Sequence, residues 1–335
     1  MSSTAGISLS HAQAELGVMR AASIASPGRM EISNPALPEP VAGQLRIKVE
    51  GCGVCASNLE VWKGQPWFSY PLAPGEPGHE GWGIIDTTDA MRPDLSPGDR
   101  VAFLSGHAYA EYDLAATDQI VKLPGDLNGM PFPGEAIGCA MNIFRRSQIE
   151  PGQTVAIVGI GFLGALLTQL CVNAGARVIA VSRRQFALDI ATQYGADAAI
   201  QLREALDVTE QVKDLTNGQL CERVIEAVGN QQALDLASEL CAERARMMIA
   251  GYHQDGGRNV NMWLWNWRGL DVVNAHERDP RVYVEGIKLA IDAVADHKID
   301  PFSLITHNYG LDKLGDALNA VRDRPDGFLK AVITT

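Results

Sequence analysis

A glycine-rich segment placed directly after an apolar run constrains the fold of this chain more than any other feature. Residues 155–158 form the apolar run, Gly159-Ile160-Gly161-Phe162-Leu163-Gly164 follows at once, and residues 165–172 have the composition of a helix. Here the first glycine permits a tight turn, the second lets the backbone approach a pyrophosphate, and the third lets the helix pack on the strand. Alone, the hexapeptide would also fit a structural turn. Between a strand and a helix it predicts a dinucleotide site, contacted by Gly159, Gly161, Phe162, Leu163 and Gly164.

Strands and helices alternate through the part of the chain that follows Pro151-Gly152. Further strands are expected at 177–181, 224–228 and 247–251, with helices at 186–194 and 233–241. Such alternation predicts a parallel sheet covered by helices on both faces, which is the doubly wound α/β class.

The preceding part, up to about residue 150, is rich in Gly and Pro between short apolar runs, as in a β-rich domain with many turns. Residues 1–18 read as a polar extension without a packing pattern. A helix at 284–295 and a tail with β character complete the chain. A length of 335 residues suits about two domains.

Composition excludes several classes of protein. The formal charge of −12 argues against nucleic-acid binding, which needs a basic surface. The N-terminus lacks the pattern of a secretory signal, and no apolar run approaches the ~20 residues that span a bilayer. Six scattered cysteines fit reduced thiols in a cytoplasm better than a disulfide framework.

The residues that follow the second strand bear on the choice of cofactor. An NAD enzyme usually places an acidic residue there for the ribose 2′-hydroxyl, whereas this chain reads Ser182-Arg183-Arg184. No carboxylate would repel a 2′-phosphate, and two guanidinium groups can bind one. The sequence therefore favours NADP(H), and NAD(H) remains if both arginines are only solvated.

A cysteine and a histidine in the β-rich part predict a metal site. Cys55 and His79, the latter within Gly78-His79-Glu80-Gly81, offer a thiolate and an imidazole, which suit Zn²⁺. A catalytic zinc keeps three protein ligands and one open position, so a third ligand is needed. Glu135 and Cys139 lie four residues apart and share one face if 133–144 is helical. Glu135 is preferred, Cys139 follows closely, and Glu80 is a further candidate that swaps in as bound water leaves.

These motifs, in this order and spacing, resemble the medium-chain, zinc-dependent alcohol and polyol dehydrogenases over nearly the whole chain after residue 18. The matching segments are Gly53 to Asn58, Gly78 to Gly83, Gly98 to Val101, Gly134 to Cys139, Gly159 to Gly164 and Ile225 to Gly229. The resemblance implies a GroES-like catalytic domain, residues 19–141 plus 284–335, and an inserted Rossmann domain, residues 142–283.

The resemblance also implies roles for single residues. Cys55 and His79 match zinc ligands, Ser57 matches the hydroxyl that conveys the substrate proton outward, and Lys330 matches a basic residue at the cofactor pyrophosphate. Glu135 sits where polyol-type members have a glutamate ligand and Cys139 where alcohol-type members have a cysteine. Catalysis is thus expected to involve Cys55, Ser57, His79 and Glu80.

The chain departs from the family pattern at three places. The aspartate that orients the zinc-bound histidine is Asn58, and the histidine that often ends the proton relay is Glu60. The four-cysteine lobe for a second, structural zinc is absent, so one zinc per chain is predicted.

Together these features predict a zinc-dependent oxidoreductase that moves a hydride between a nicotinamide cofactor and a secondary alcohol or ketone, most simply a polyol, sugar or cyclitol. Two alternatives stay open: a zinc-free quinone or enone reductase of the same superfamily, and a non-catalytic nucleotide-binding protein. The expected partner is a small molecule, with no nucleic acid or membrane. A homodimer or homotetramer is expected because relatives assemble so, and Trp263, Trp265 and Trp267 suit a domain or subunit interface.

Overall fold

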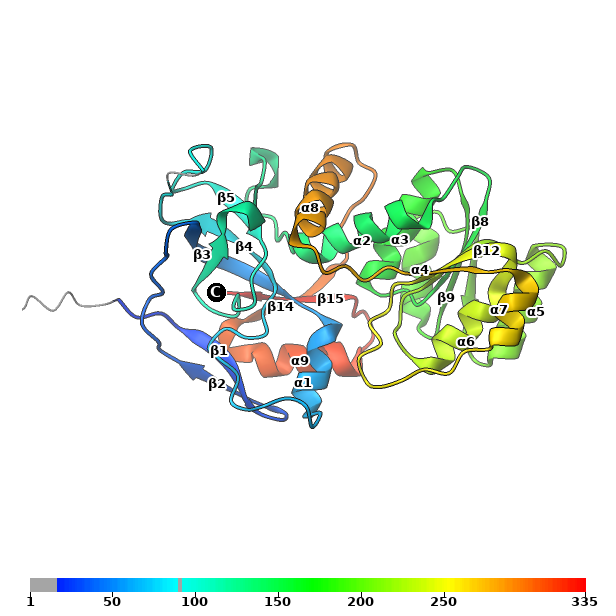
Figure 1. The fold of residues 1–335 in the computed structure, drawn as a ribbon, viewed down its shortest axis with the longest axis horizontal. Coiled ribbons are helices and arrows are strands. Elements are labelled where there is room, and N and C mark those ends of the chain that lie inside the picture. Colours follow the sequence, from blue (N-terminus) through cyan, green and yellow to red (C-terminus); the bar gives the residue numbers. More distant parts are fainter. Residues whose placement is uncertain (1–16, 90–91) are drawn as a thin grey trace, which may run out of the picture.

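The computed structural model describes residues 17–89 and 92–335. The predicted extension 1–18 therefore lies almost wholly outside the described residues. Figure 1 shows an elongated molecule with two halves, each built on its own sheet, and with α2 (Gly134–Ser147) and α8 (Pro280–Ala295) lying between them. No helix of the described part is long and apolar enough to cross a membrane.

The first half is built on a mostly antiparallel sheet that combines both ends of the described chain. In order across the sheet, its strands are β14 (Ile305–Gly310), β15 (Lys330–Thr334), β3 (Gln44–Val54), β4 (Glu80–Ile85), β5 (Arg100–Phe103) and β7 (Ile120–Lys122), with β6 (Tyr112–Ala116) paired to β3. Strands β1 (Ala21–Ser26) and β2 (Arg29–Ser33) form a separate hairpin, and the helices of this half are α1 (Leu59–Lys63) and α9 (Leu314–Asp323). Because β15 pairs with β3, residues near 330 are brought beside residues near 54.

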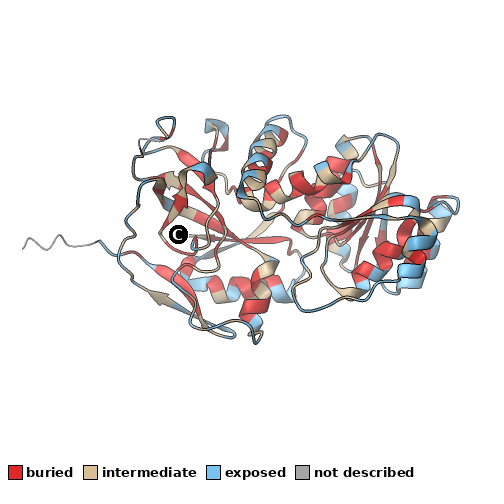
Figure 2. Ribbon diagram, in the orientation of Figure 1, coloured by how far each residue is buried: buried red, intermediate tan, exposed pale blue. Residues whose placement is uncertain are grey.

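The second half is the predicted doubly wound α/β unit. Its strands are all parallel, in the order β10 (Ala198–Gln201), β9 (Arg177–Ser182), β8 (Thr154–Val158), β11 (Cys221–Glu226), β12 (Cys241–Ile249) and β13 (Asp271–Asn274). The helices are α3 (Phe162–Asn173), α4 (Gln185–Gln193), α5 (Ala205–Leu215), α6 (Gln231–Leu240) and α7 (Met262–Arg268). Numbered from β8, this order is 3-2-1-4-5-6, the arrangement of dinucleotide-binding Rossmann domains. The predicted fold class is confirmed, and Figure 2 shows the strands buried between exposed outer helix faces.

Two helices that link the halves pack at very short range. A Cβ placed on Gly138 of α2 (Gly134–Ser147) would lie 2.9 Å from the backbone nitrogen of Ile287, and one on Gly286 of α8 (Pro280–Ala295) would lie 2.6 Å from the Gly138 carbonyl oxygen. Glycines at both positions thus let the two backbones touch, which fixes the orientation of α2 and of the side chains beside Gly138.

The structure corrects one expectation and bears on another. The tail with β character contains helix α9 between β14 and β15, so that part of the prediction is wrong. Its apolar side chains Leu314, Ala317, Leu318 and Val321 recur at helical spacing and are buried. The predicted domain limits at 141/142 and 283/284 fall inside α2 and α8, and as boundaries they stay predictions.

Candidate functional site

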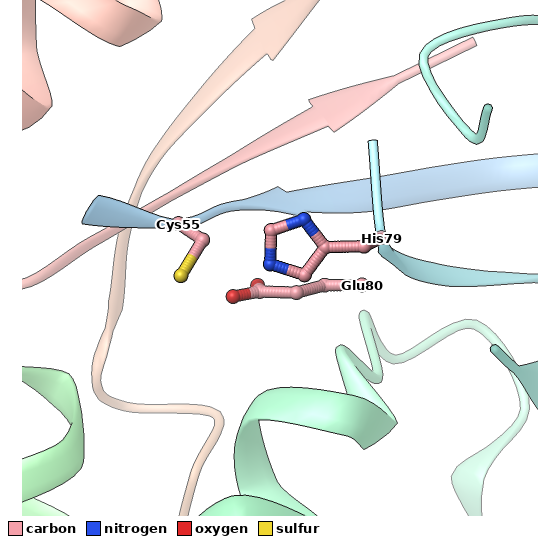
Figure 3. Close-up of side chains that lie close together, drawn as sticks. All are labelled: Cys55, His79 and Glu80. Atoms are coloured by element: carbon pink, nitrogen blue, oxygen red, sulfur yellow. The ribbon is translucent and has the colours of Figure 1, made fainter. Parts of the chain in front are cut away.

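Three side chains that can bind a metal come together where β3 ends and β4 begins. Cys55 follows β3 directly, and His79 precedes Glu80, the first residue of β4. The two strands are antiparallel with Gly53 opposite Glu80, so pairing alone brings the three residues to one place. Their ligand atoms lie within 4.8 Å of one another, and Figure 3 shows the Cys55 sulfur, the His79 ring and the Glu80 carboxylate side by side. Among the described residues Glu135 and Cys139 are not part of this three-residue cluster.

The imidazole of His79 is oriented by the backbone. Its Nδ1 lies 2.9 Å from the carbonyl oxygen of Pro77, which places the proton on Nδ1 and leaves Nε2 as the free ligand atom. The Ser57 hydroxyl lies 3.5 Å from Nε2. Asn58, which stands at the position of the family's orienting aspartate, donates to the Tyr109 hydroxyl at 2.8 Å.

Glu80 is fully buried and pairs with Lys330. The Lys330 ammonium lies 2.5 Å from Glu80 Oε2 and donates to the Val54 carbonyl at 3.3 Å. Apart from that ion pair, neither Glu80 oxygen accepts a well-aligned hydrogen bond from the described residues. Gly53 makes room for the carboxylate, since a Cβ there would lie 1.7 Å from Oε2. A buried, poorly satisfied carboxylate beside a thiol and an imidazole suits a cation.

Lys330 also contacts the second half of the molecule, the doubly wound α/β unit. Its ammonium lies 5.2 Å from the ring centroid of Phe162, the first residue of α3. The predicted role of Lys330 at a pyrophosphate stays a prediction. What the structure places there is a buried cation that joins Glu80 to the start of the fingerprint helix.

Glu135 and Cys139 share one face of α2, as predicted from their spacing. Cys139 Sγ donates to Glu135 Oε1 at 3.3 Å. Both side chains are half-buried. Burial raises the pKa of Cys139, and Glu135 raises it further. A thiol that keeps its proton donates to Glu135 and leaves that carboxylate as the better ligand.

Negatively charged neighbours dominate the electrostatics around His79. Burial alone would lower the pKa of His79, but Cys55, Glu135 and Glu80 outweigh burial and raise it to about 10. Burial also raises the pKa of Glu135, although His79 opposes this. The pocket thus holds protons that a divalent cation would displace, so its donor set fits Zn²⁺.

Glu60 and Cys52 lie apart from this chemistry. The Glu60 carboxylate accepts from Lys63 at 2.8 Å and from Gln65 at 2.6 Å, so it is held by its own helix and the turn after it. Cys52 is fully buried, and burial raises the pKa of its thiol well above the usual value. A buried thiol that keeps its proton acts as a small packing residue.

The fingerprint glycines have the geometry that the motif predicts. Gly159 has φ +103°, and a Cβ on Gly164 would lie 2.1 Å from the Gly159 carbonyl oxygen, so the first and third positions exclude side chains. A Cβ on Gly161 would meet nothing within 4 Å. Gly161 is also the N-cap of α3 and forms no side-chain cap, so the open space borders unpaired helix N–H groups.

The two arginines after β9 have different surroundings. Arg184 donates to the carbonyls of Phe328 and Ile160, so its guanidinium is engaged in holding backbone. Arg183 is exposed and donates to Gln232 at 2.5 Å. Arg203, just past the neighbouring strand β10, is also exposed and donates to Gln201, whose amide in turn donates to the Arg183 carbonyl. The sequence reasoning missed Arg203, and its only signal was a position just after the third strand.

Comparisons with known protein families match both halves of the chain. Residues 41–130 match the family described as alcohol dehydrogenase GroES-like domain, and residues 163–296 match the family described as zinc-binding dehydrogenase.

Individual relatives agree with these matches. An alcohol dehydrogenase of Geobacillus stearothermophilus is 30% identical over 223 residues, 56% of this chain and 65% of that enzyme. A sorbitol dehydrogenase of Halalkalibacterium halodurans is 25% identical over 85% of this chain and 91% of its own length. A crystal structure of a putative zinc-binding dehydrogenase from Sinorhizobium meliloti 1021, bound to NADP, superposes with a TM-score of 0.80 at 24% identity, covering 95% of this chain and all of that one. The chain therefore belongs to the medium-chain, zinc-dependent alcohol and polyol dehydrogenase family of oxidoreductases.

Proposed function

We propose that this protein is a zinc-dependent, NADP(H)-preferring dehydrogenase that interconverts a secondary alcohol and a ketone. The observation that carries the proposal is the contact between the two predicted sites. The cluster of Cys55, His79 and Glu80 is joined through Lys330 to Phe162 at the start of the fingerprint helix. Hydride transfer requires the substrate and the nicotinamide to lie next to each other, and this contact supports such an arrangement.

Cys55, His79 and Glu135 would hold the metal, with Glu80 beside them as an alternate ligand. Zinc supplies a Lewis acid that lowers the pKa of a hydroxyl group, while the nicotinamide accepts or returns the hydride. Three protein ligands of this kind would leave one position at the metal open for substrate. Cys139 supports Glu135 by donating to it.

Ser57 is the proposed proton carrier. Its hydroxyl lies 3.5 Å from His79 Nε2 and donates to the side-chain oxygen Oδ1 of Asn58 at 3.5 Å, so an acceptor stands next to it. A hydroxyl can accept the substrate proton while it donates its own to a neighbour. Glu60 remains held by Lys63 and Gln65, so the path beyond Ser57 runs elsewhere.

The preference for NADP(H) is supported by two exposed guanidinium groups at the carboxyl ends of β9 and β10, where we expect the adenosine ribose. Arg183 follows β9, and Arg203 follows the adjacent strand β10. None of the three residues Ser182, Arg183 and Arg184 is acidic. The substrate class we favour is a polyol, sugar or cyclitol, in keeping with the sorbitol dehydrogenase relative that covers most of this chain.

We further propose one zinc per chain, a cytoplasmic location and assembly as a homodimer or homotetramer. Trp263 and Trp267 of α7 stack 6.0 Å apart and are 70% and 73% exposed. Trp265 between them instead packs inward and donates to Ser238 at 3.0 Å. Two exposed, stacked tryptophans on α7, the helix that precedes the edge strand β13 in the chain, support a subunit interface.

The test combines metal analysis, cofactor titration and a substrate panel on the purified protein. One zinc per chain with NADP⁺-dependent oxidation of polyols is the expected result, and Arg183→Ala should reduce the preference for NADP⁺ over NAD⁺. Reduction of enones without metal would instead identify a zinc-free reductase. Cofactor binding without turnover of any alcohol, polyol or enone would identify a binding protein.

A further inference from the structure

A buried carboxylate that the metal site does not use lies at the carboxyl end of β11. Glu226 is fully buried. Its Oε1 accepts the backbone N–H groups of Val228 at 2.7 Å and Gly229 at 2.8 Å, and its Oε2 lies 3.0 Å from His253 Nε2. One carboxylate thus fastens the loop that follows its own strand and reaches the loop that follows β12.

The imidazole of His253 lies between Glu226 and a guanidinium. Arg258 Nε donates to His253 Nδ1 at 2.8 Å. Because a guanidinium only donates, Nδ1 must accept, and the ring proton is placed on Nε2, where it points at Glu226. The three side chains form a chain of donors and acceptors with a single direction.

The same guanidinium closes the arrangement into a ring. A terminal nitrogen of Arg258 donates to the Gly229 carbonyl at 3.0 Å. Just beyond, Gln231 donates to the Asn259 carbonyl at 2.8 Å and accepts from the Asn259 N–H at 3.0 Å. The loops after β11 and β12 are therefore held together at both ends.

These loops lie against the dinucleotide fingerprint. A Cβ on Gly159 would lie 2.4 Å from Val228 Cγ2, and one on Gly251 would lie 2.6 Å from Glu226 Oε2. In a sheet ordered β10-β9-β8-β11-β12-β13, Arg183 marks the adenosine side, after β9, and the loops after β11 and β12 lie on the other side of β8. A dinucleotide bound across the carboxyl ends of such a sheet places its nicotinamide half over them.

We propose that Glu226, His253 and Arg258 form a positioning network that fixes these two loops as the support for the nicotinamide half of the cofactor. This inference rests on the proposed function, because it assumes a dinucleotide at the fingerprint. None of the three residues belongs to the metal pocket, so the network acts on cofactor binding and leaves zinc content unchanged.

Glu226→Gln is the sharpest variant because no orientation of the amide satisfies the network. If the amide nitrogen faces His253, two donors meet, and if it faces Val228 and Gly229, it meets two N–H groups. Moving the ring proton of His253 to Nδ1 would set it against Arg258. His253→Gln is the conservative partner, since its amide can still donate to Glu226 while the acceptor for Arg258 is lost.

The experiment is calorimetric titration of the zinc-loaded wild type and variants with NADPH and 2′,5′-ADP, and with NADH and ADP. Glu226→Gln should weaken dinucleotide binding by roughly tenfold, which corresponds to about 1.4 kcal/mol, because buried donors are left unsatisfied, and His253→Gln should weaken it by less. Binding of the adenosine fragments should not change. Glu222→Gln is the matched control. Glu222 lies at the amino end of the same strand, β11, away from the two loops, and its carboxylate accepts from the Thr154 N–H.

Equal loss of dinucleotide and fragment binding would overturn the proposal, because it would indicate general damage to the Rossmann half. Unchanged dinucleotide affinity in Glu226→Gln, with a cooperative thermal transition, would also overturn it. A wild type that binds neither dinucleotide nor fragment would overturn the proposed function, and this inference with it.

Discussion

The metal pocket and the fingerprint loop are adjacent, yet they are built in opposite ways. In the pocket, ionisable side chains carry the chemistry: Cys55, His79, Glu80 and Lys330 lie close together, and the acidic groups there raise the pKa of His79 and of Lys330 despite burial. At the fingerprint, the backbone N–H groups at the start of α3 are the binding groups. They are accessible because Gly161 has no side chain and leaves open space beside them. A site made of charges responds to pH, metal and isosteric substitution, whereas a site made of backbone responds mainly to volume.

The largest expected effect comes from the metal pocket. Cys55→Ser should lose zinc and lower kcat by roughly a thousandfold, because a Lewis acid supplies several kcal/mol of charge stabilisation. Metal analysis and steady-state kinetics of the same preparation check this, while titration with NADPH should show intact cofactor binding. Normal turnover by a zinc-free Cys55→Ser protein would show that the reaction does not depend on a metal bound in the pocket.

The third ligand gives the next largest effect. Glu135→Gln should reduce zinc affinity by more than the ~10–100-fold typical of losing only a supporting residue. Cys139→Ser is the matched variant on the same helix face, and it should retain zinc because a serine hydroxyl still donates to Glu135. Competition with a chelator measures both affinities. The reverse order would make Cys139 the ligand.

On the backbone side, Gly161→Ala should weaken dinucleotide binding by about tenfold while stability barely changes. The added methyl group meets open space in the protein but blocks the approach of a pyrophosphate. Gly164→Ala should instead lower the thermal midpoint, because its Cβ would lie 2.1 Å from the Gly159 carbonyl oxygen. Calorimetric titration and thermal unfolding separate the two. A Gly161→Ala protein with normal affinity would place the cofactor elsewhere.

The smallest effect is a pH dependence of the metal-free protein. The pKa of His79 is raised from 6.5 to about 10 in the fold, so its stabilising contribution is fully present below pH 6.5 and is lost as pH rises toward 10. Thermal midpoints of chelator-treated protein should therefore fall over that range, and those of the zinc-loaded protein should fall less. His79→Gln, treated with chelator, should show a flatter profile. Identical profiles for wild type and His79→Gln would show that His79 does not carry the effect.

Local patterns explain why much of this architecture could be predicted. Alternating strands and helices, the Gly159 to Gly164 segment and the four-residue spacing of Glu135 and Cys139 are all short-range signals, and the structure agrees with each. Helix α9 was missed because its neighbours are strands and its own apolar stripe is only three turns long.

Contacts between residues far apart in the sequence could not be predicted, because local patterns carry only short-range signals. Glu80 and Lys330 meet only because β15 pairs with β3, and no local pattern records that pairing. The orienting partner of His79 is the Pro77 carbonyl, and backbone acceptors leave no trace in residue identity. The network of Glu226, His253 and Arg258 likewise depends on two loops that meet only after the parallel sheet has formed.

The ion pair between Glu80 and Lys330 has a consequence for the order of events during biosynthesis. Glu80 is translated long before Lys330, so its carboxylate has no counter-ion when β3 and β4 first leave the ribosome. A buried lone carboxylate is costly, and the chain can avoid that cost only by keeping this pocket hydrated or protonated until β15 docks. The proposed metal centre is therefore complete only once β15, the last strand of the sheet, has paired with β3 and brought Lys330 beside Glu80.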